Sequence, residues 1–379
     1  MSDALSTSKA RCAIIGATGY TGGELLRILN SHPYAGVTQI TSRSRVGEYA
    51  HVPHPNLRGT RVGGLQFIRP EDVQKADVIF LCLPHGEAGA QIDRWAALAD
   101  VLVDLSADFR LQDIDAYAKW YSEAHKAPQW LERFVYGLPE LTREQLRGAR
   151  YASGVGCNAT ATNLALLPLV RAGMLDFSQP IIADVKVGSS EGGAESSDAT
   201  HHPERSGAVR SYAPAGHRHI AEVEQMIEIE NAKMKIEKGE SVNAATRVAA
   251  TRDPQPVIHM SVTSIEMVRG VLATVHAFLR QPAQEKDLWR AFRACYKDEP
   301  FVRIVKSNTG IFRLPEPKIL AGSNWADVGF ALDRDGRKVT LLCAIDNLMK
   351  GAAGSAVQSL NVMMGWDERA GLEFTGLHP

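Results

Sequence analysis

A strand, a glycine-rich turn and a helix near the N-terminus constrain the fold more than any other feature. Residues 11–16 are a short apolar run, residues 16–23 include four glycines, and residues 24–29 have helical apolar spacing. Glycines in such a turn let the backbone approach a pyrophosphate, which binds at the helix N-terminus. A purely structural turn is the alternative, but the strand–turn–helix context favours dinucleotide binding. The residues predicted to bind the dinucleotide are Gly16, Thr18, Gly19, Tyr20, Thr21 and Gly22.

The end of the next predicted strand, residues 37–41, indicates which dinucleotide is bound. The strand runs into Ser42-Arg43-Ser44-Arg45 and carries no carboxylate there. An acid at this place bonds the ribose hydroxyls of NAD, whereas hydroxyl and guanidinium groups suit the 2′-phosphate of NADP. We therefore predict NADP(H), bound by Ser42, Arg43 and Arg45. A solvated basic turn is the alternative.

Two further predicted strands end in polar loops. Residues 77–83 lead into Pro84-His85-Gly86-Glu87, and residues 101–105 lead into Ser106–Arg110. Ligands of an open parallel sheet bind beyond the carboxyl ends of its strands. We expect Pro84 at the cofactor and Arg110 as a clamp on a substrate phosphate, because guanidinium bonds two oxygens in a fork. An ion pair between Arg110 and Asp104 or Asp108 is the structural alternative.

Cys157 is the candidate nucleophile. It stands between Gly156 and a run of small residues, just before an apolar segment that would continue as a helix. A helix N-terminus favours a thiolate, and small neighbours leave the sulfur open, although a packing cysteine is the common alternative. The other four cysteines lie in apolar strand-like runs or a helical segment, where we expect them in the core: Cys12, Cys82, Cys295 and Cys343. Without CxxC spacing, the set indicates reduced thiols in a cytoplasm, with no zinc site.

A histidine pair is the candidate acid/base group. In an extended segment His217 and His219 would point to the same side and could approach one site beside a cysteine. No third ligand has the spacing of a metal site, and we predict no metal. A capping or core histidine is the alternative for each residue.

The length of 379 residues predicts two domains, because one hydrophobic core rarely grows so large. We expect an α/β fold: a Rossmann-type parallel-sheet domain over residues 1–156, an α+β domain over 157–345, and a helix in 346–379 that returns to the first domain. Strands are predicted at 181–189, 259–267 and 271–279, and a surface excursion at 229–254. The net charge of −1 gives no indication of nucleic-acid or membrane binding.

Five motifs together resemble the N-acetyl-γ-glutamyl-phosphate reductases, relatives of aspartate-semialdehyde dehydrogenase. They fall in the order of that family and cover nearly the whole chain: residues 16–22, 104–110, 156–157, 217–219 and 346–351. The resemblance implies a cytoplasmic homodimer or homotetramer with an NADP-binding domain and a substrate and dimerisation domain. It also implies that Asn347 contributes to the cofactor site.

Departures from the arginine-pathway pattern are similar to those of the carrier-protein branch of the family. Cys157-Asn158-Ala159-Thr160 replaces Cys-Tyr-Pro-Thr, and Ile220-Ala221-Glu222 replaces a Pro-Glu pair; residues 201–205 and 376–379 also fit. This branch implies 2-aminoadipate 6-phosphate or glutamate 5-phosphate, attached through its amino group to a small acidic carrier protein. A free N-acetylated substrate is the nearest alternative, and a non-catalytic NADP-sensing protein is a distant one. A basic, histidine-rich rim would suit the carrier: His201, Arg205, Arg210 and Arg218.

The resemblance also implies the chemistry. Cys157 would attack the acyl phosphate to form a thioester, which hydride from NADPH would reduce to a semialdehyde, in lysine or arginine biosynthesis. His219 or His217 would move the proton; His219 is favoured because it lies nearer the predicted helix. Backbone amides at Cys157 and Asn158 are candidates for the oxyanion site. The residues expected at the substrate are Arg110, Asn158, Ser189, Arg205 and Arg210.

Overall fold

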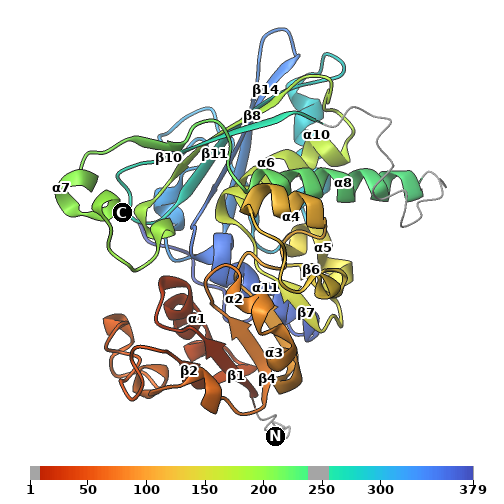
Figure 1. The fold of residues 1–379 in the computed structure, drawn as a ribbon. Helices are drawn as coiled ribbons and strands as arrows, with labels where there is room; N and C mark the ends of the chain where they lie inside the picture. The colour runs from red at the N-terminus through yellow and green to blue at the C-terminus, as the bar shows by residue number, and fades with distance from the viewer. Residues whose placement is uncertain (1–8, 238–255, 379) are drawn as a thin grey trace, which may run out of the picture. The chain divides into compact units, whose positions relative to one another are not determined.

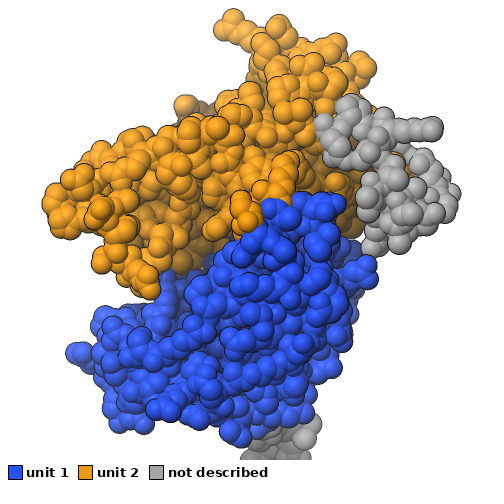
Figure 2. All heavy atoms as spheres, in the orientation of Figure 1, with its two compact units in different colours: residues 1–118, 123–155, 352–374 blue, residues 119–122, 156–351, 375–379 orange. Residues whose placement is uncertain are grey.

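The computed structural model describes residues 9–237 and 256–378, and the chain divides into two compact units (Figures 1 and 2). Unit 1 comprises residues 1–118, 123–155 and 352–374, and unit 2 comprises residues 119–122, 156–351 and 375–379. The chain therefore enters unit 2 directly before Cys157 and returns to unit 1 after Gly351.

Unit 1 contains a seven-stranded parallel sheet in the order β3-β2-β1-β4-β5-β7-β6. The strand order reverses between β1 and β4, which is the switch point where doubly wound sheets bind ligands. Its central strands are continuous apolar runs because both faces of a parallel sheet are covered. The strands are β1 (Ala10–Ile15), β2 (Ala35–Thr41), β3 (Phe67–Ile68), β4 (Ala76–Leu81), β5 (Ala99–Asp104), β6 (Val135–Tyr136) and β7 (Tyr151–Ser153).

The helices of unit 1 include one from the end of the chain. α11 (Gly354–Met363) packs against α5 (Pro139–Leu146) and α1 (Tyr20–Ser31). α2 (Glu87–Ala90) and α3 (Ile92–Leu98) follow β4, and α4 (Ile114–Tyr121) follows β5. The predicted Rossmann-type domain is confirmed.

Unit 2 contains a seven-stranded mixed sheet in the order β12-β13-β14-β11-β8-β10-β9. The three predicted strands correspond to β8 (Ile181–Val187), β10 (Ile258–Ser264) and β11 (Val271–Phe278). Alternate residues of these strands are buried, which is the pattern of a sheet covered on one face. The remaining strands are β9 (Arg210–Ala213), β12 (Val302–Ile304), β13 (Ala326–Leu332) and β14 (Lys338–Ile345).

The central helix of unit 2 is α6 (Cys157–Arg171), which contacts β11, β14 and the helices α8 (Ile220–Glu237) and α10 (Glu285–Tyr296) (Figure 1). Residues 158–170 of α6 are all buried, in agreement with a sequence that is small or apolar on every side. Cys157 is thus the first residue of a helix fixed along its whole length.

The predicted surface excursion at 229–254 is wrong in its first part, because α8 continues to Glu237. Apolar residues keep helical spacing, and the carboxylate of Glu230 accepts hydrogen bonds from Arg171 at 3.0 Å and Lys233 at 2.8 Å. Residues 238–254 of that prediction lie outside the described residues. Within the described ranges, no helix is both long and apolar enough to cross a membrane.

Candidate active site

The glycine turn after β1 has the close contacts of a dinucleotide-binding turn. Gly16 has φ +82°, and a Cβ there would lie 2.5 Å from the carbonyl oxygen of Cys82. A Cβ on Gly22 would lie 2.6 Å from the Cα of Ala17, so α1 packs closely on the turn. By contrast, a Cβ on Gly19 would meet no atom of the described residues within 4 Å. The turn therefore packs closely at Gly16 and Gly22 and is open at Gly19, where a pyrophosphate would approach.

The N-terminus of α1 fits the same anion. Gly19 is its N-cap, and the first turn contains no acidic residue. The first amide groups of a helix have no acceptor within it and carry partial positive charge. Tyr20, Thr21 and Gly22 occupy this turn. The residues present therefore suit a nicotinamide dinucleotide.

Both arginines of the turn after β2 have carboxylate partners in unit 1. Arg43 contacts Glu87 through two nitrogens, at 3.2 and 2.6 Å, and Arg45 contacts Glu48 at 2.9 Å. The side chain of Arg43 is 63% exposed, so this pair contributes about 1 kcal/mol at most. The buried hydroxyl of Ser42 accepts hydrogen bonds from the backbone at 44 and 45 and fixes the turn. A phosphate dianion can compete for Arg43 against so weak a partner.

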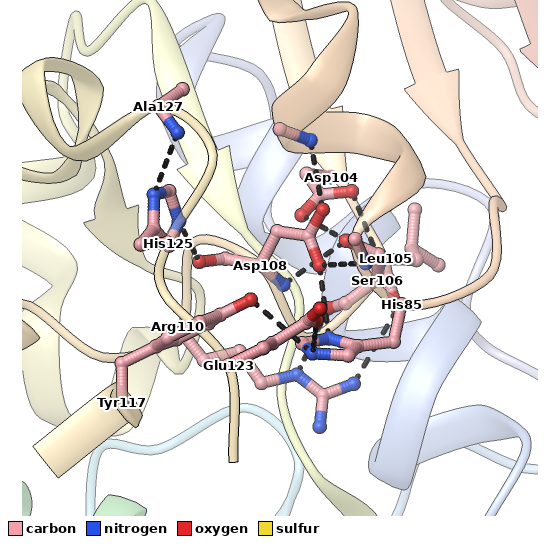
Figure 3. A network of polar contacts seen from close by, with 12 residues as sticks. His85, Asp104, Leu105, Ser106, Asp108, Arg110, Tyr117, Glu123, His125 and Ala127 are labelled. Atoms are coloured by element: carbon pink, nitrogen blue, oxygen red, sulfur yellow. Dashed lines mark hydrogen bonds and ion pairs between the residues drawn. The ribbon is translucent and has the colours of Figure 1, made fainter. Parts of the chain in front are cut away.

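The turn after β5 places Arg110 differently from its expected role. Its Nε donates to the carbonyl of Ser106 at 3.0 Å and its terminal nitrogen to that of Leu105 at 3.4 Å (Figure 3). The guanidinium therefore folds back on its own turn, which Phe109 anchors by stacking on Phe134 at 4.1 Å between ring centroids. Pro84 is exposed and lies in the loop after β4. The substrate-clamp role of Arg110 stays a prediction.

Cys157 begins α6, with Gly156 as the N-cap. Its side chain is partly exposed, whereas Cys12 and Cys343 are 0% exposed, and its Sγ lies 3.7 Å from Oδ1 of Asn158. The positive end of the helix dipole stabilises a thiolate at this position. Cys82 and Cys295, expected in the core, are also partly exposed, but burial raises the pKa of both thiols.

Two glycines allow the backbone at Cys157 to pack closely. A Cβ on Gly156 would lie 2.6 Å from Nε2 of His219 and 2.5 Å from Oε1 of Glu222. A Cβ on Gly351, in the π-helical segment Met349–Ala353, would lie 2.6 Å from the Cβ of Cys157. Neither position has room for a side chain. The backbone at Gly156 and Gly351 therefore packs directly beside Cys157, with the imidazole of His219 against Gly156.

The predicted histidine pair lies beside this wall. The rings of His217 and His219 meet edge to face at 4.4 Å between centroids, and Nδ1 of His217 accepts the backbone N–H of His219 at 3.2 Å. His219 is 6% exposed and approaches Gly156. The structure therefore brings His219, rather than His217, against the residue that precedes the nucleophile.

Glu222 belongs to this group but was not predicted. It is 1% exposed, its Oε2 accepts the N–H of Gly156 at 2.8 Å, and its Oε1 lies 3.9 Å from Nε2 of His219. The sequence could have indicated Glu222 through its spacing of three residues from His219 at the start of α8. This spacing places both side chains on one face.

Glu191 and Tyr212 form a second group near the nucleophile that the sequence did not reveal. The hydroxyl of Tyr212 donates to the carboxylate of Glu191, and the ring of Tyr212 lies 6.2 Å from that of His217. Burial raises the pKa of both groups, with Asn158 among their neighbours. Asn158, predicted at the substrate, is 0% exposed, and the atom of its side chain that faces the thiol of Cys157 is the oxygen Oδ1, at 3.7 Å. The Asn158 amide therefore lies directly beside the nucleophile.

Arg205 and Arg210 serve the backbone around them. Arg205 donates to the carbonyl of Ile265, and Arg210 donates to those of Ala199 at 3.1 Å and Glu204 at 2.8 Å. The segment of residues 188–209 contributes no strand to the sheet. The two arginines donate to backbone carbonyls of this segment and to that of Ile265. Their roles toward substrate or carrier stay predictions.

Asn347 and Ser189 also make internal contacts within unit 2. Nδ2 of Asn347 donates to the hydroxyl of Ser190 at 2.8 Å, and its Oδ1 accepts the N–H of Gly270 at 2.8 Å. The N–H of Ser189 donates to the carbonyl of Met267 at 2.8 Å. Both ends of the Asn347 amide are therefore used to hold the loops, and its cofactor role stays a prediction.

Comparison with known proteins agrees with this organisation. A family model described as the NAD binding domain of semialdehyde dehydrogenase matches residues 11–149, and one described as its dimerisation domain matches residues 157–347. Aspartate semialdehyde dehydrogenase II of Vibrio cholerae, solved with ASA, has a TM-score of 0.66 at 14% identity, covering 95% of this chain and 99% of that one. The enzyme of Candida albicans, solved with NADP, has a TM-score of 0.63 at 14% identity, covering 94% and 99%. These structures share the fold.

Closer relatives carry names from the carrier-protein branch. The LysW-L-2-aminoadipate 6-phosphate reductase of Deinococcus radiodurans is 46% identical over 99% of this chain and 100% of its own. The LysW-L-2-aminoadipate/LysW-L-glutamate phosphate reductase of Saccharolobus solfataricus is 43% identical over 98% and 99%. A relative from Thermomicrobium roseum is 50% identical over 97% and 98%. The chain belongs to the semialdehyde dehydrogenase family, in the carrier-protein branch that its motifs predict.

Proposed function

We propose that this oxidoreductase reduces a carrier-linked acyl phosphate, 2-aminoadipate 6-phosphate or glutamate 5-phosphate, to its semialdehyde with NADPH. The observation that carries the proposal is the partly exposed thiol of Cys157 at the start of a buried helix, with His219 packed against the preceding Gly156. The names of the relatives support the LysW-linked substrate and a place in lysine or arginine biosynthesis.

The residues around Cys157 support a thioester route. The thiolate attacks the acyl carbon, the carbon–oxygen bond to phosphate breaks, and phosphate leaves with the bonding electrons. The first backbone N–H groups of α6, including those of Cys157 and Asn158, donate to the carbonyl oxygen as it becomes negative. NADPH, when bound, supplies the hydride that reduces the thioester. His219, oriented beside Glu222, provides the proton for the oxygen, and collapse of the hemithioacetal returns the Cys157 thiolate.

The substrate is tested most directly in the reverse direction, with purified protein, phosphate and NADP⁺. Carrier-linked aminoadipate semialdehyde, carrier-linked glutamate semialdehyde and free N-acetylglutamate semialdehyde are compared by the absorbance of NADPH. We expect kcat/KM for a carrier-linked aldehyde to exceed that for the free one by about 100-fold or more, because the carrier adds binding energy remote from the reacting atoms. Turnover of only the free N-acetylated compound would show that the carrier assignment is wrong. No turnover of any would favour a cofactor-sensing protein.

Replacing Arg43 by Ala tests the choice of cofactor. We expect the Kd for NADPH to rise about 10- to 100-fold, because a charged hydrogen bond to the 2′-phosphate contributes about 1.5–3 kcal/mol. The Kd for NADH should change little, and fluorescence titration measures both. Lys75→Ala removes a comparably exposed cation paired with Asp100 and is the matched control. Equal weakening of NADPH and NADH by the Arg43 change would contradict a 2′-phosphate site.

We further propose a cytoplasmic homodimer or homotetramer. The five cysteines of the chain are free thiols, as expected in a reducing compartment, and residues 157–347 match a dimerisation domain. Size-exclusion chromatography with light scattering measures the oligomeric state.

A further inference from the structure

His85, in the loop after β4, has a carboxylate at each nitrogen of its ring (Figure 3). Nδ1 lies 3.0 Å from Oδ1 of Asp108, and Nε2 lies 2.8 Å from Oε1 of Glu123. The hydroxyl of Tyr117 lies 3.2 Å from Nε2. Three separate segments of unit 1 therefore meet at one imidazole: the turn after β5, helix α4 and the segment that follows it.

Asp108 holds the loop that carries His85. Its Oδ1 accepts the N–H of Gly86 at 2.7 Å and its Oδ2 accepts that of Gly89 at 2.8 Å, one at each end of the first turn of α2. The side chain is 1% exposed. A buried carboxylate without partners costs several kcal/mol, and the two backbone N–H groups, with the ring of His85 at 3.0 Å, are the partners of Asp108.

The ring of His85 joins the two carboxylates. Its Nε2 lies within hydrogen-bond distance of Glu123, whereas Nδ1 lies close to Asp108 without an aligned hydrogen bond. The imidazole therefore connects the turn after β5 with the segment that follows α4.

The loop held in this way borders the predicted cofactor site on two sides. Glu87, directly after Gly86, contacts Arg43 of the proposed 2′-phosphate turn. The carbonyl of Cys82, at the start of the loop, lies where a side chain on Gly16 would stand. A displacement of this loop would therefore change the surroundings of both the pyrophosphate turn and the phosphate-binding arginine.

We propose that His85 is a positioning residue for the dinucleotide, which bridges Asp108 and Glu123 and fixes the loop of residues 82–90. The inference rests on the proposed cofactor. It gives the side chain of His85 the role of holding the loop beside the cofactor turn.

Several other ionisable groups face this cluster. The phenol of Tyr117 touches the ring, and the Nζ of Lys126 and Oε1 of Glu123 would lie 2.9 and 3.3 Å from a Cβ on Gly86. Nε2 of His125 donates to the backbone carbonyl of Asp108 at 2.7 Å, and burial lowers the pKa of this histidine. Arg110 lies on the same turn.

Asp104, at the end of β5, is a neighbour of this cluster whose own charge can change near neutral pH. Burial and, next, the charge of Asp108 raise its pKa to about 7. Its carboxylate accepts hydrogen bonds from the backbone and hydroxyl of Ser106, which Asn at the same position can retain in part. The measurements below are therefore made in an Asp104→Asn background as well as in the natural one.

The test uses the full-length apoprotein labelled with ¹⁵N-glycine and three variants: His85→Gln, Glu123→Gln and His125→Gln. The amide signals of Gly86 and Gly89 report directly on the hydrogen bonds to Asp108, and fluorescence titration gives the Kd for NADPH. We expect His85→Gln to shift both signals and to raise this Kd about 10-fold, with KM for NADPH rising more than kcat falls. His125→Gln removes backbone contacts to Asp108 and Ala127 and ring contacts to Phe109 and Tyr117, but it leaves both carboxylates at His85 in place. It is the control and should change the Kd less.

Glu123→Gln keeps the proposal testable if His85→Gln folds poorly, because the Glu123 side chain is 39% exposed. Loss of this anion should shift the two glycine signals and raise the Kd for NADPH about 3-fold, because the bridge to His85 is weakened. Unchanged glycine signals and an unchanged Kd in both variants would overturn the proposal. If the unaltered protein failed to bind NADPH at all, the proposed cofactor would be wrong instead, so the two failures are distinguishable.

Discussion

Replacing Cys157 by Ser should lower the rate of semialdehyde formation by about 10⁴-fold or more, while the Kd for NADPH stays unchanged. A serine hydroxyl at the N-terminus of α6 does not ionise near neutral pH, so the helix dipole has no anion to stabilise and no acyl-enzyme forms. NADPH affinity should persist because the dinucleotide turn belongs to unit 1 and Cys157 to unit 2. Phosphate release in a single turnover measures formation of the acyl-enzyme, and fluorescence titration measures the Kd for NADPH.

The matched control is Cys295→Ser, which alters another partly exposed thiol. Burial raises the pKa of Cys295 to about 11 and that of Cys12 to about 12, so both should react slowly with iodoacetamide. Cys157 should be alkylated first, and its modification should parallel the loss of activity. Full turnover by the Cys157→Ser variant would show that the reaction needs no thioester.

Replacing His219 by Asn should reduce kcat by about 10²- to 10⁴-fold, the usual contribution of a general acid/base. The same change at His217 should cost about 10-fold, because His217 acts through the backbone N–H of His219 and its neighbouring ring. We expect the larger loss at His219 because its ring packs against Gly156 and lies 3.9 Å from the carboxylate of Glu222. The measurement is kcat as a function of pH, in which the His219 variant should lose one ionisation.

Glu224→Gln is the control for changes on α8 near His219. Glu224 is a carboxylate of the same helix whose pKa burial raises, but it has no contact with Gly156 among those of the described residues. Its substitution should leave the pH profile in place. Equal losses in the His217 and His219 variants would mean that the pair acts as one unit, and a larger loss in His217 would reverse the assignment.

The sequence sufficed to predict features that depend on neighbours along the chain. The turn from Gly16 to Gly22, the helix that begins at Cys157 and three strands of unit 2 all follow from local spacing, and the structure has them. Each is specified by alternation, helical periodicity or close backbone contact, which short stretches of sequence encode directly.

Contacts between distant segments could not be predicted in the same way. The bond from Gly156 to Glu222 spans 66 residues, and no periodic pattern relates the two positions. Glu123 meets His85, and Glu191 meets Tyr212, only because strands and loops return to the same place in the fold. Arg110 shows the converse case: a guanidinium expected to point toward a ligand satisfies carbonyls of its own turn.

The two glycines against Cys157 also bear on inhibitor resistance. Enzymes commonly escape a covalent inhibitor by enlarging a side chain beside the modified residue. Here positions 156 and 351 have no such freedom, because a single added carbon would lie 2.5 Å from Glu222 or 2.6 Å from Cys157 itself. A compact electrophile that packs against the backbone at these two positions would therefore meet a surface that the protein cannot change without displacing Glu222, His219 or its own nucleophile.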